Sequence, residues 1–340
     1  MLLRNISFPF RVFDRFSSRI GPKEVEFPGL EYRFIGLNSP AAIPKSTWHS
    51  SGILLIVLAS LLWSTSGFFA RAPQLDIWPQ EERGAVLSFW RAIFALSLML
   101  PCIRRPSWSW GMLPMVACFA VMNWTYLTAL VSGPPANAIW LQNLAPVWVM
   151  LVGVFFLGER TIPRDWMMLG LCATGVLFIL YFQIRQGGSG GQLAMWLGLL
   201  SGVFYAGVVL SLRMLRTQDP AWLVAANHLT TAVVMAPFAL ASSHYPQGST
   251  WILFAAFGMF QMGLPYLLFA RGLQTTPSHL ASVLTLLEPI LLPLWIHLAW
   301  SHTAGYEPPP WWTLIGGAFI LAGLLVRFTP LPSRSPKTST

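Results

Sequence analysis

The 340-residue sequence has few charged residues. Lysine and arginine together occupy 21 positions and aspartate and glutamate 12, so 10% of the chain is charged whereas 55% is hydrophobic. Soluble globular proteins carry about 25% charged residues. A water-soluble protein of this length would need more charged side chains to cover its surface. The composition therefore indicates an integral membrane protein in contact with the lipid bilayer.

Several motifs that define other functions are missing. There is no GxxxxGK[ST] phosphate loop, which excludes an ATPase domain of that type. There is also no HExxH motif and no pair of carboxylates within a hydrophobic segment, which argues against a membrane-embedded enzyme. The cysteines, Cys102, Cys118 and Cys172, lack metal-ligand spacing, and we interpret them as packing residues. We expect no enzyme activity, metal site or cofactor.

The formal net charge of +9 does not indicate nucleic-acid binding. The basic residues neither cluster on one predicted face nor alternate with aromatic residues as in a binding groove. We therefore expect no nucleic-acid partner, and we interpret the basic residues as markers of membrane topology.

Ten hydrophobic segments are long enough to cross roughly 30 Å of hydrocarbon. Connections between them are short and rich in glycine, proline and charge. The predicted spans are 52–70, 85–103, 110–130, 136–157, 166–183, 193–212, 221–242, 250–270, 279–299 and 311–328. An even number of spans places both termini on the same side of the membrane.

The distribution of arginine and lysine predicts on which side of the membrane the termini lie. If the N-terminal segment is cytoplasmic, seventeen of the 21 basic residues lie on the cytoplasmic side; Arg71, Arg83 and Arg185 lie on the other side and Arg91 lies within a span. This asymmetry is the positive-inside pattern. We expect both termini to be cytoplasmic.

The chain divides into four parts. Residues 1–50 contain basic residues without a long hydrophobic run, and we expect a disordered or amphipathic cytoplasmic leader. A start codon assigned too early and an organellar transit sequence are the alternatives. Residues 51–184 and 192–328 each hold five spans, and residues 329–340 form a cytoplasmic tail.

The two five-span parts share a motif. Pro134, Ala138 and Pro146 recur as Pro277, Ala281 and Pro289, with a constant shift of 143 residues. Because each part has an odd number of spans, the second copy enters the membrane in the opposite orientation. Such inverted repeats are typical of secondary transporters, which bind substrate near the membrane midplane between the repeats.

The residues around these motifs resemble a known family. APVWVMLVGVFFLGER followed by WMMLGLCATGVLFIL, and ASVLTLLEPILLPLW followed by WWTLIGGAFILAGLLV, are similar to the two EamA domains of the drug/metabolite transporter superfamily. The resemblance covers about residues 52–328. It implies an all-α integral membrane protein of ten helices in two inverted five-helix repeats, which exports amino acids or other small metabolites across the bacterial inner membrane.

Two ionisable residues lie within hydrophobic spans, where a charge costs about 2.5–3.5 kcal/mol or more. They are Arg91, in SFWRAIFAL, and Glu288, in LTLLEPILL. One interpretation is that Arg91 binds an anionic substrate group in a central cavity, while Glu288 binds a proton or a substrate amine. The other is that they pair with each other or with backbone carbonyls and have a structural role.

Pro146 and Pro289 predict interruptions in the fourth and ninth spans. Proline has no backbone N–H, and its ring disturbs the helix one turn earlier. For Pro289 that position is near Thr285, beside Glu288; the first copy has Ala145 where the second has Glu288. Any proton site based on this glutamate is therefore present in one repeat only.

Uncharged polar residues within spans form a second set of candidates. They lie in the third, fourth, seventh and eighth spans and include Asn123, Tyr126, Gln142, Asn143, Asn227, His228, Gln261 and Tyr266. Each could contact substrate, or hydrogen bond between helices as is common in bundles. Trp63, related to Tyr205 by the repeat, is a candidate aromatic wall of the cavity. Glu159 and Arg160 are expected to anchor a cytoplasmic hairpin, with a gating salt bridge as the alternative.

Together these features predict a secondary active transporter that exports small metabolites such as amino acids by alternating access, with or without proton coupling. A multidrug or quaternary-compound exporter is the alternative, and an integral-membrane lipid-modifying enzyme is a distant one. We expect a multi-pass protein of the bacterial inner membrane, monomeric or homodimeric, with a small-molecule substrate.

Overall fold

The computed structural model describes residues 48–156, 158, 161–186, 189–215, 217–242, 244–273, 275–276, 278–304 and 306–328. The predicted leader, except residues 48–50, and the predicted tail lie outside these ranges, as do Glu159 and Arg160. The described residues form helices and connecting turns, without a strand. Ten of the helical stretches are long and apolar enough to cross a membrane, which confirms the predicted number of spans.

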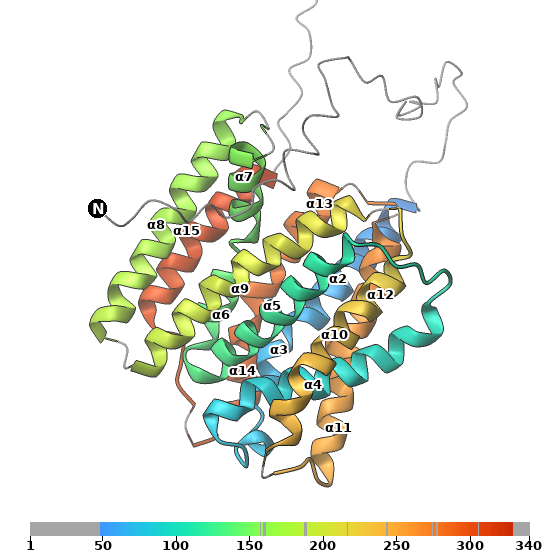
Figure 1. Cartoon of the computed structure of the whole chain (residues 1–340). Helices are drawn as coiled ribbons and strands as arrows, with labels where there is room; N and C mark the ends of the chain where they lie inside the picture. Colours follow the sequence, from blue (N-terminus) through green and yellow to red (C-terminus); the bar gives the residue numbers. More distant parts are fainter. Residues whose placement is uncertain are drawn as a thin grey trace, which may run out of the picture. The chain divides into compact units, whose positions relative to one another are not determined.

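The first five spans comprise eight helical segments (Figure 1). They are α2 (Trp48–Ser64) with α3 (Ser66–Ala70), α4 (Gln80–Met99) with η2 (Leu100–Cys102), α5 (Met112–Ser132), α6 (Pro135–Gln142) with α7 (Ala145–Phe156), and α8 (Pro163–Gln186). The short helix η1 (Pro73–Leu75) lies between the first two spans.

The second five spans follow the same order. They are α9 (Ser189–Met214), α10 (Pro220–Leu240), α11 (Ser249–Ala256) with η3 (Phe257–Gly263) and α12 (Leu264–Gly272), α13 (Ser278–Thr285) with α14 (Leu287–Trp300), and α15 (Trp311–Phe328). The segment η3 is a π-helix that joins α11 to α12 in one continuous span.

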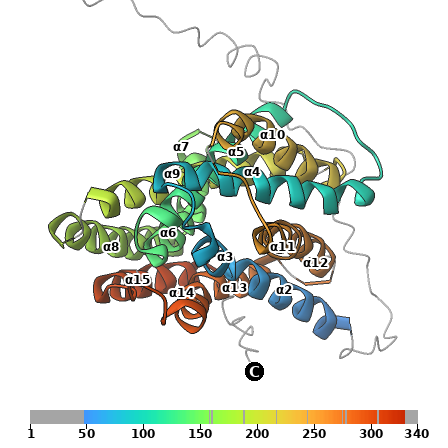
Figure 2. The same ribbon diagram turned by 90° about the horizontal axis from the view of Figure 1, so that it is seen from below.

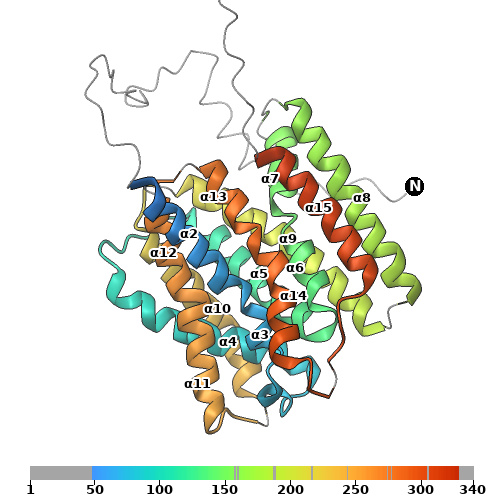
Figure 3. The ribbon, with the colours of Figure 1, turned by 180° about the vertical axis from the view of Figure 1, so that it is seen from behind.

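Helix packing follows the expected pseudo-twofold relation between the repeats. Helix α2 of the first repeat packs on α12 of the second, and the equivalent helices α9 and α5 pack on each other. Two further large contacts join a helix to its own counterpart, α4 to α10 and α8 to α15. Figures 2 and 3 show α8 and α15 side by side at one flank, away from α11 and α12.

Helices α4 and α10 run antiparallel and are joined at both ends. The indole Nε1 of Trp78, just before α4, donates to the backbone oxygen of His244, just after α10, at 2.8 Å. The indole Nε1 of Trp222, at the start of α10, donates to the backbone oxygen of Ser107, beyond the end of α4, at 2.7 Å. The opposite direction of these equivalent helices is the inversion that the duplication predicted.

Glycine allows α8 and α15 to approach closely. A methyl group added to Gly175 would lie 2.4 Å from the backbone oxygen of Gly316, and one added to Gly316 would lie 2.7 Å from that of Gly175. Small residues at helix contacts are typical of membrane proteins, where close packing of backbones drives association.

The fourth and ninth spans are interrupted just before their prolines. Helix α6 ends at Gln142 and α7 begins at Ala145, with Pro146 in its first turn. Helix α13 ends at Thr285 and α14 begins at Leu287, with Pro289 in its first turn. The two interruptions bring irregular backbone to the middle of the bundle.

Candidate functional site

A cavity of about 630 Å³ lies between the two repeats. Its volume is within the range of small-molecule sites, about 300–1,000 Å³. Both repeats contribute to its walls, and ten of the residues singled out in the sequence line it: Trp63, Arg91, Asn123, Tyr126, Gln142, Asn143, Pro146, Gln261, Tyr266 and Glu288. The structure thus brings together polar residues from spans that are far apart in the sequence.

Arg91 is the buried cation of this cavity, with a relative exposure of 2%. Its Nη2 donates to Oδ1 of Asn123 and its Nη1 donates to Oε1 of Gln261 at 3.4 Å. The guanidinium also lies over the ring of Phe257, 5.0 Å from the centroid. Amide oxygens and an aromatic face orient the guanidinium but do not neutralise its charge. Within the described residues no carboxylate pairs with Arg91.

The π-helix η3 holds the cavity residue Gln261 against Arg91. Gln261 Nε2 donates to the backbone oxygen of Trp63 at 3.1 Å, so its amide bridges α2 and α4. Close packing of η3 on α4 depends on Gly258, where an added methyl group would lie 2.7 Å from the backbone oxygen of Arg91. π-Helical turns within α-helices are frequent at functional sites. The equivalent span of the first repeat, α5, has no such segment.

Glu288 also lines the cavity and lies in the first turn of α14. The positive end of the helix dipole stabilises an anionic side chain at this position, which offsets part of the cost of placing it within the membrane. Arg91 and Glu288 form no ion pair, and in the described part of the chain no hydrogen bond holds the Glu288 carboxylate. The cavity therefore contains an arginine and a glutamate that are not ion-paired with each other.

Aromatic side chains form another wall. Trp63 meets Tyr266 edge to face and Phe269 at a tilt, both with ring centroids 5.3 Å apart. Tyr126 is nearly buried, and its hydroxyl is hydrogen bonded to Ser66 Oγ at 2.9 Å. The wall from Trp63 to Phe269 offers apolar surface within the same cavity as Arg91 and Glu288.

Both helix interruptions border the cavity. Asn143 Nδ2 donates to the backbone oxygen of Ile139 at 3.0 Å and so covers the end of α6, while Gln142 is buried beside it. In the second repeat, Thr285 Oγ1 donates to the backbone oxygen of Ser282 at 2.9 Å at the end of α13. Side chains thus hydrogen bond with the backbone where the helical pattern stops.

Three of the sequence candidates lie outside the cavity lining. Pro289 is buried in α14, and Asn227 and His228 are buried in α10 with exposures of 2% and 0%. The His228 ring packs edge to face on Phe119, with centroids 5.1 Å apart. Both residues belong to α10, which packs on α4 and α5, and neither lines the cavity.

Other cavity features were not singled out in the sequence. Asp165 and Arg327 line the cavity and form an ion pair, with Arg327 Nε 2.6 Å from Asp165 Oδ1. Asp165 Oδ2 also accepts from the backbone N–H of Ile162 at 2.8 Å. Asp165 and Arg327 are 162 positions apart, so no local pattern in the sequence relates them. Phe257, which lies outside the cavity lining but contacts the Arg91 guanidinium, has no sequence signal that separates it from an ordinary packing residue.

The cavity extends toward one end of the bundle. Its lining includes Thr161 and Asp165 at the start of α8, together with Arg327 and Phe328 at the end of α15. We refer to this end as the mouth. By the sequence analysis it is the end that carries most of the basic residues.

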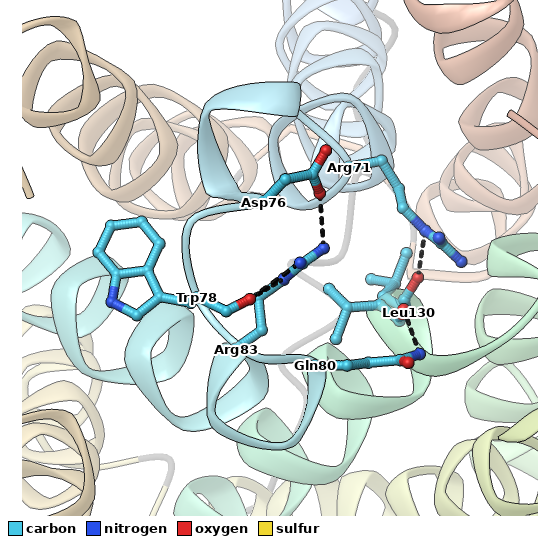
Figure 4. A network of polar contacts seen from close by, with 7 residues as sticks. Arg71, Asp76, Trp78, Gln80, Arg83 and Leu130 are labelled. Carbon is cyan, nitrogen blue, oxygen red and sulfur yellow. Dashed lines mark hydrogen bonds and ion pairs between the residues drawn. The ribbon is translucent and has the colours of Figure 1, made fainter. Parts of the chain in front are cut away.

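Polar contacts close the opposite end (Figure 4). Arg71 Nε donates to the backbone oxygen of Leu130 at 2.8 Å, and its Nη2 donates to the backbone oxygen of Gly133. Arg83 Nη1 pairs with Asp76 Oδ1 at 2.9 Å. Burial lowers the pKa of Arg71 to about 10, with a further lowering by the Arg83 charge, so Arg71 stays cationic at neutral pH. The Arg71 contacts join the end of α3 to the end of α5, and the Arg83 pair joins the start of α4 to the turn that precedes it.

Aromatic contacts between the repeats lie at the same end. The Trp300 Nε1 donates to the backbone oxygen of Phe68 at 2.8 Å, and the two rings stack with centroids 5.2 Å apart. Deeper in the bundle, Trp295 Nε1 donates to Ser64 Oγ at 2.8 Å. The closed end thus combines contacts within the first repeat and contacts between the repeats.

Comparison with protein families identifies both halves of the chain. Residues 50–181 and 192–329 each match the EamA-like transporter family. These ranges correspond to the two five-helix repeats of the structure.

Individual proteins match over most of their length. An uncharacterized transporter of Archaeoglobus fulgidus is 27% identical over 81% of this chain and 95% of its own. The pseudopaline exporter CntI of Pseudomonas aeruginosa is 26% identical over 81% and 95%, and the aromatic amino acid exporter YddG of Ancylobacter novellus is 29% identical over 82% and 97%. One crystal structure aligns with a TM-score of 0.55 at 21% identity, covering 82% of this chain and 96% of the other. At that identity the structural likeness concerns the fold alone.

Proposed function

We propose that this chain, which belongs to the EamA-like transporter family, exports a small zwitterionic metabolite such as an amino acid by alternating access. The observation that carries this proposal is the pair of unneutralised charges in one cavity, Arg91 and Glu288. A substrate with both a carboxylate and an amine would complement both groups, whereas either group alone would accept many other ions.

Arg91 is the proposed carboxylate site. Its planar guanidinium can bind a carboxylate through two parallel hydrogen bonds, and such charge-assisted bonds are stronger than neutral ones. The oxygens of Asn123 and Gln261 hold the guanidinium in place before substrate binds. Preorganisation of this kind reduces the entropy lost on binding.

Glu288 is the proposed site for the substrate amine and for a coupling proton. A proton that reaches Glu288 from the outer side would neutralise the carboxylate and weaken its attraction for the amine, so that substrate is released outside. This exchange links export to the proton gradient. Ala145 occupies the equivalent position in the first repeat, so the exchange involves the second repeat only.

The conformation is proposed to be the inward-facing state. The cavity extends to the mouth, which the basic residues assign to the cytoplasm, and the Arg71 and Trp300 contacts close the other end. Alternating access requires a second state in which these contacts separate and the mouth closes. Both termini are then cytoplasmic, in the bacterial inner membrane.

The alternative, an exporter of multidrug or quaternary ammonium compounds, is favoured by the aromatic wall in the same cavity as Glu288. Arg91 argues against it, because a buried guanidinium in the same cavity repels cationic substrates. Whether transport requires a carboxylate on the substrate therefore distinguishes the two functions.

An export screen tests this proposal. Cells overexpressing the wild type, Arg91→Ala or the control Arg185→Ala would be compared for the metabolites they release. Arg185 is an exposed arginine outside the cavity, with its guanidinium 5.6 Å from the Tyr181 centroid. We expect loss of carboxylate-bearing compounds from the Arg91→Ala medium only. Equal export by all three strains would contradict the proposal.

A further inference from the structure

We propose that Arg91, Asn123, Asn227 and His228 enclose a buried hydration site beside the cavity, in which ordered water fixes the orientation of the Arg91 guanidinium. Asn227 and His228 thereby act as positioning residues, through water, for a cavity residue that they do not touch. The hydration site is independent of which substrate the cavity binds.

The four side chains are buried on three helices that pack on one another. Helix α10, which carries Asn227 and His228, packs on α4 and α5. Arg91 of α4 is bonded to Asn123 of α5, and the His228 ring contacts Phe119, one turn before Asn123. All four side chains are at least 98% buried.

Each of these side chains has polar atoms without a hydrogen-bond partner in the described structure. They are Arg91 Nε, Asn123 Nδ2, Asn227 Oδ1 and both ring nitrogens of His228. Buried polar atoms are nearly always hydrogen bonded to protein or to ordered water. Five such atoms on three adjacent helices are the observation from which we infer bound water.

The hydrogen-bonding types of these atoms complement water. Arginine is a donor only, so Asn123 must present its oxygen to Arg91, which leaves its Nδ2 as a donor. Arg91 Nε and Asn123 Nδ2 can donate to a water oxygen, whose two hydrogens can bond to Asn227 Oδ1 and to the acceptor nitrogen of His228. Buried waters typically make about three hydrogen bonds and occupy sites lined by two to four polar groups.

The geometry gives the site a function. Arg91 Nη1 and Nη2 each donate one hydrogen bond, to Gln261 and Asn123, and each keeps a second N–H for a substrate, whereas Nε has no partner in the described structure. A water bound to Nε fixes the third edge of the guanidinium plane. The guanidinium then presents a constant face to the cavity, as a two-point carboxylate site requires.

An experimental map of the wild-type protein, at a resolution that shows ordered water, tests the site directly. We expect density within hydrogen-bond distance of Arg91 Nε, Asn123 Nδ2 and Asn227 Oδ1. Direct pairing of these atoms with one another, or a dry contact, would overturn the proposal. This measurement needs no substrate, so it is independent of the proposed function.

A matched pair of variants tests the positioning role. Asn227→Leu has a similar shape but removes the acceptor, whereas Asn227→Asp keeps an oxygen at the same place. L-Phenylalanine serves as the probe in reconstituted vesicles. We expect Asn227→Leu to raise KM about tenfold with little change in kcat. Loss of a hydrogen-bond partner of a metal ligand weakens metal binding on a similar scale. Recovery by Asn227→Asp supports the proposal. An unchanged KM in folded Asn227→Leu, or equal loss in both variants, would contradict it.

Discussion

Trp78 and Trp222 make the same contact at opposite ends of the antiparallel pair α4 and α10. Each indole N–H donates to a backbone oxygen of the other repeat, that of His244 at 2.8 Å and that of Ser107 at 2.7 Å. The residues differ in burial, because Trp78 is 1% exposed and Trp222 is half-buried. The inverted repeat is thus visible in individual hydrogen bonds as well as in helix order.

This relationship predicts unequal effects of the two tryptophans on stability. Trp78→Phe and Trp222→Phe each lose one hydrogen bond, which contributes about 1 kcal/mol. Trp78→Phe also leaves unfilled space in the core. We therefore expect Trp78→Phe to lower the free energy of unfolding by about 2–3 kcal/mol, and Trp222→Phe to lower it by about 1 kcal/mol. Unfolding in mixed detergent micelles measures both. Because the sites are distant, the double variant should show the sum; a larger cost for Trp222→Phe would contradict the structure.

The crossing of α8 and α15 predicts a contrast between two glycines of the same helix. In Gly175→Ala the added methyl group meets the backbone oxygen of Gly316, and overpacking of this kind costs about 1–3 kcal/mol. Gly170→Ala meets no atom within 4 Å and should be neutral or slightly stabilising, because alanine favours helix. Thermal unfolding of the two variants in one detergent makes the comparison. Equal destabilisation would show that α8 and α15 do not cross at Gly175.

Asp219, at the mouth end of α10, should make a pH-dependent contribution to the stability of the fold. Partial burial acts to raise its pKa, but the backbone N–H groups of Arg105, Arg104 and Ala221 outweigh burial and hold the pKa below its ordinary value. A lowered pKa in the folded state means that the stabilisation is complete above the unfolded pKa, about 3.9, and is lost as the pH falls through the folded value.

Two substitutions separate the charge of Asp219 from its helix-capping role. Asp219→Ala should cost about 1 kcal/mol at neutral pH, because its side chain accepts from Ala221 N at 3.0 Å as the N-cap of α10. Asp219→Asn keeps a capping oxygen without a titrating group, so its stability should approach that of the wild type below about pH 4. Unfolding across roughly pH 3–7 gives the curves; parallel curves for wild type and Asp219→Asn would contradict the assignment.

Glu288 predicts a loss of coupling. Glu288→Gln keeps the size of the side chain but can no longer exchange a proton, so transport should become independent of the pH gradient. Glu288→Asp keeps the carboxylate and should retain gradient dependence at a lower rate. Vesicles with an imposed pH gradient measure both. Wild-type pH dependence in Glu288→Gln would remove the coupling role.

Much of the fold could be predicted from the sequence because span length and hydropathy are local properties. The shift between Pro146 and Pro289 indicated inversion, and the hydrophobic runs indicated ten spans, which the structure confirms. The family match confirms the expected relationship to EamA transporters.

The sequence could not predict how far each helix is rotated about its axis. Asn123 lines the cavity whereas Asn227 is buried against α4 and α5, although both are polar residues within hydrophobic spans. Helix rotation is set by packing between distant segments. The π-helix η3 was also not predicted, since FGMFQMG has the composition of an ordinary hydrophobic helix.

Arg91 and Glu288 are proposed to recognise the two charges of one substrate. Counterflow in reconstituted vesicles would compare L-phenylalanine with its N-acetyl derivative, which lacks the amine charge, and its methyl ester, which lacks the carboxylate. We expect the wild type to prefer L-phenylalanine. Arg91→Ala should transport L-phenylalanine about 30-fold or more less efficiently than the wild type, which is the effect of removing one partner of a buried charge pair. Glu288→Gln should lose the preference over the N-acetyl derivative, and Arg91→Ala the preference over the ester. If both variants discriminate among the three compounds as the wild type does, Arg91 and Glu288 do not recognise the two substrate charges.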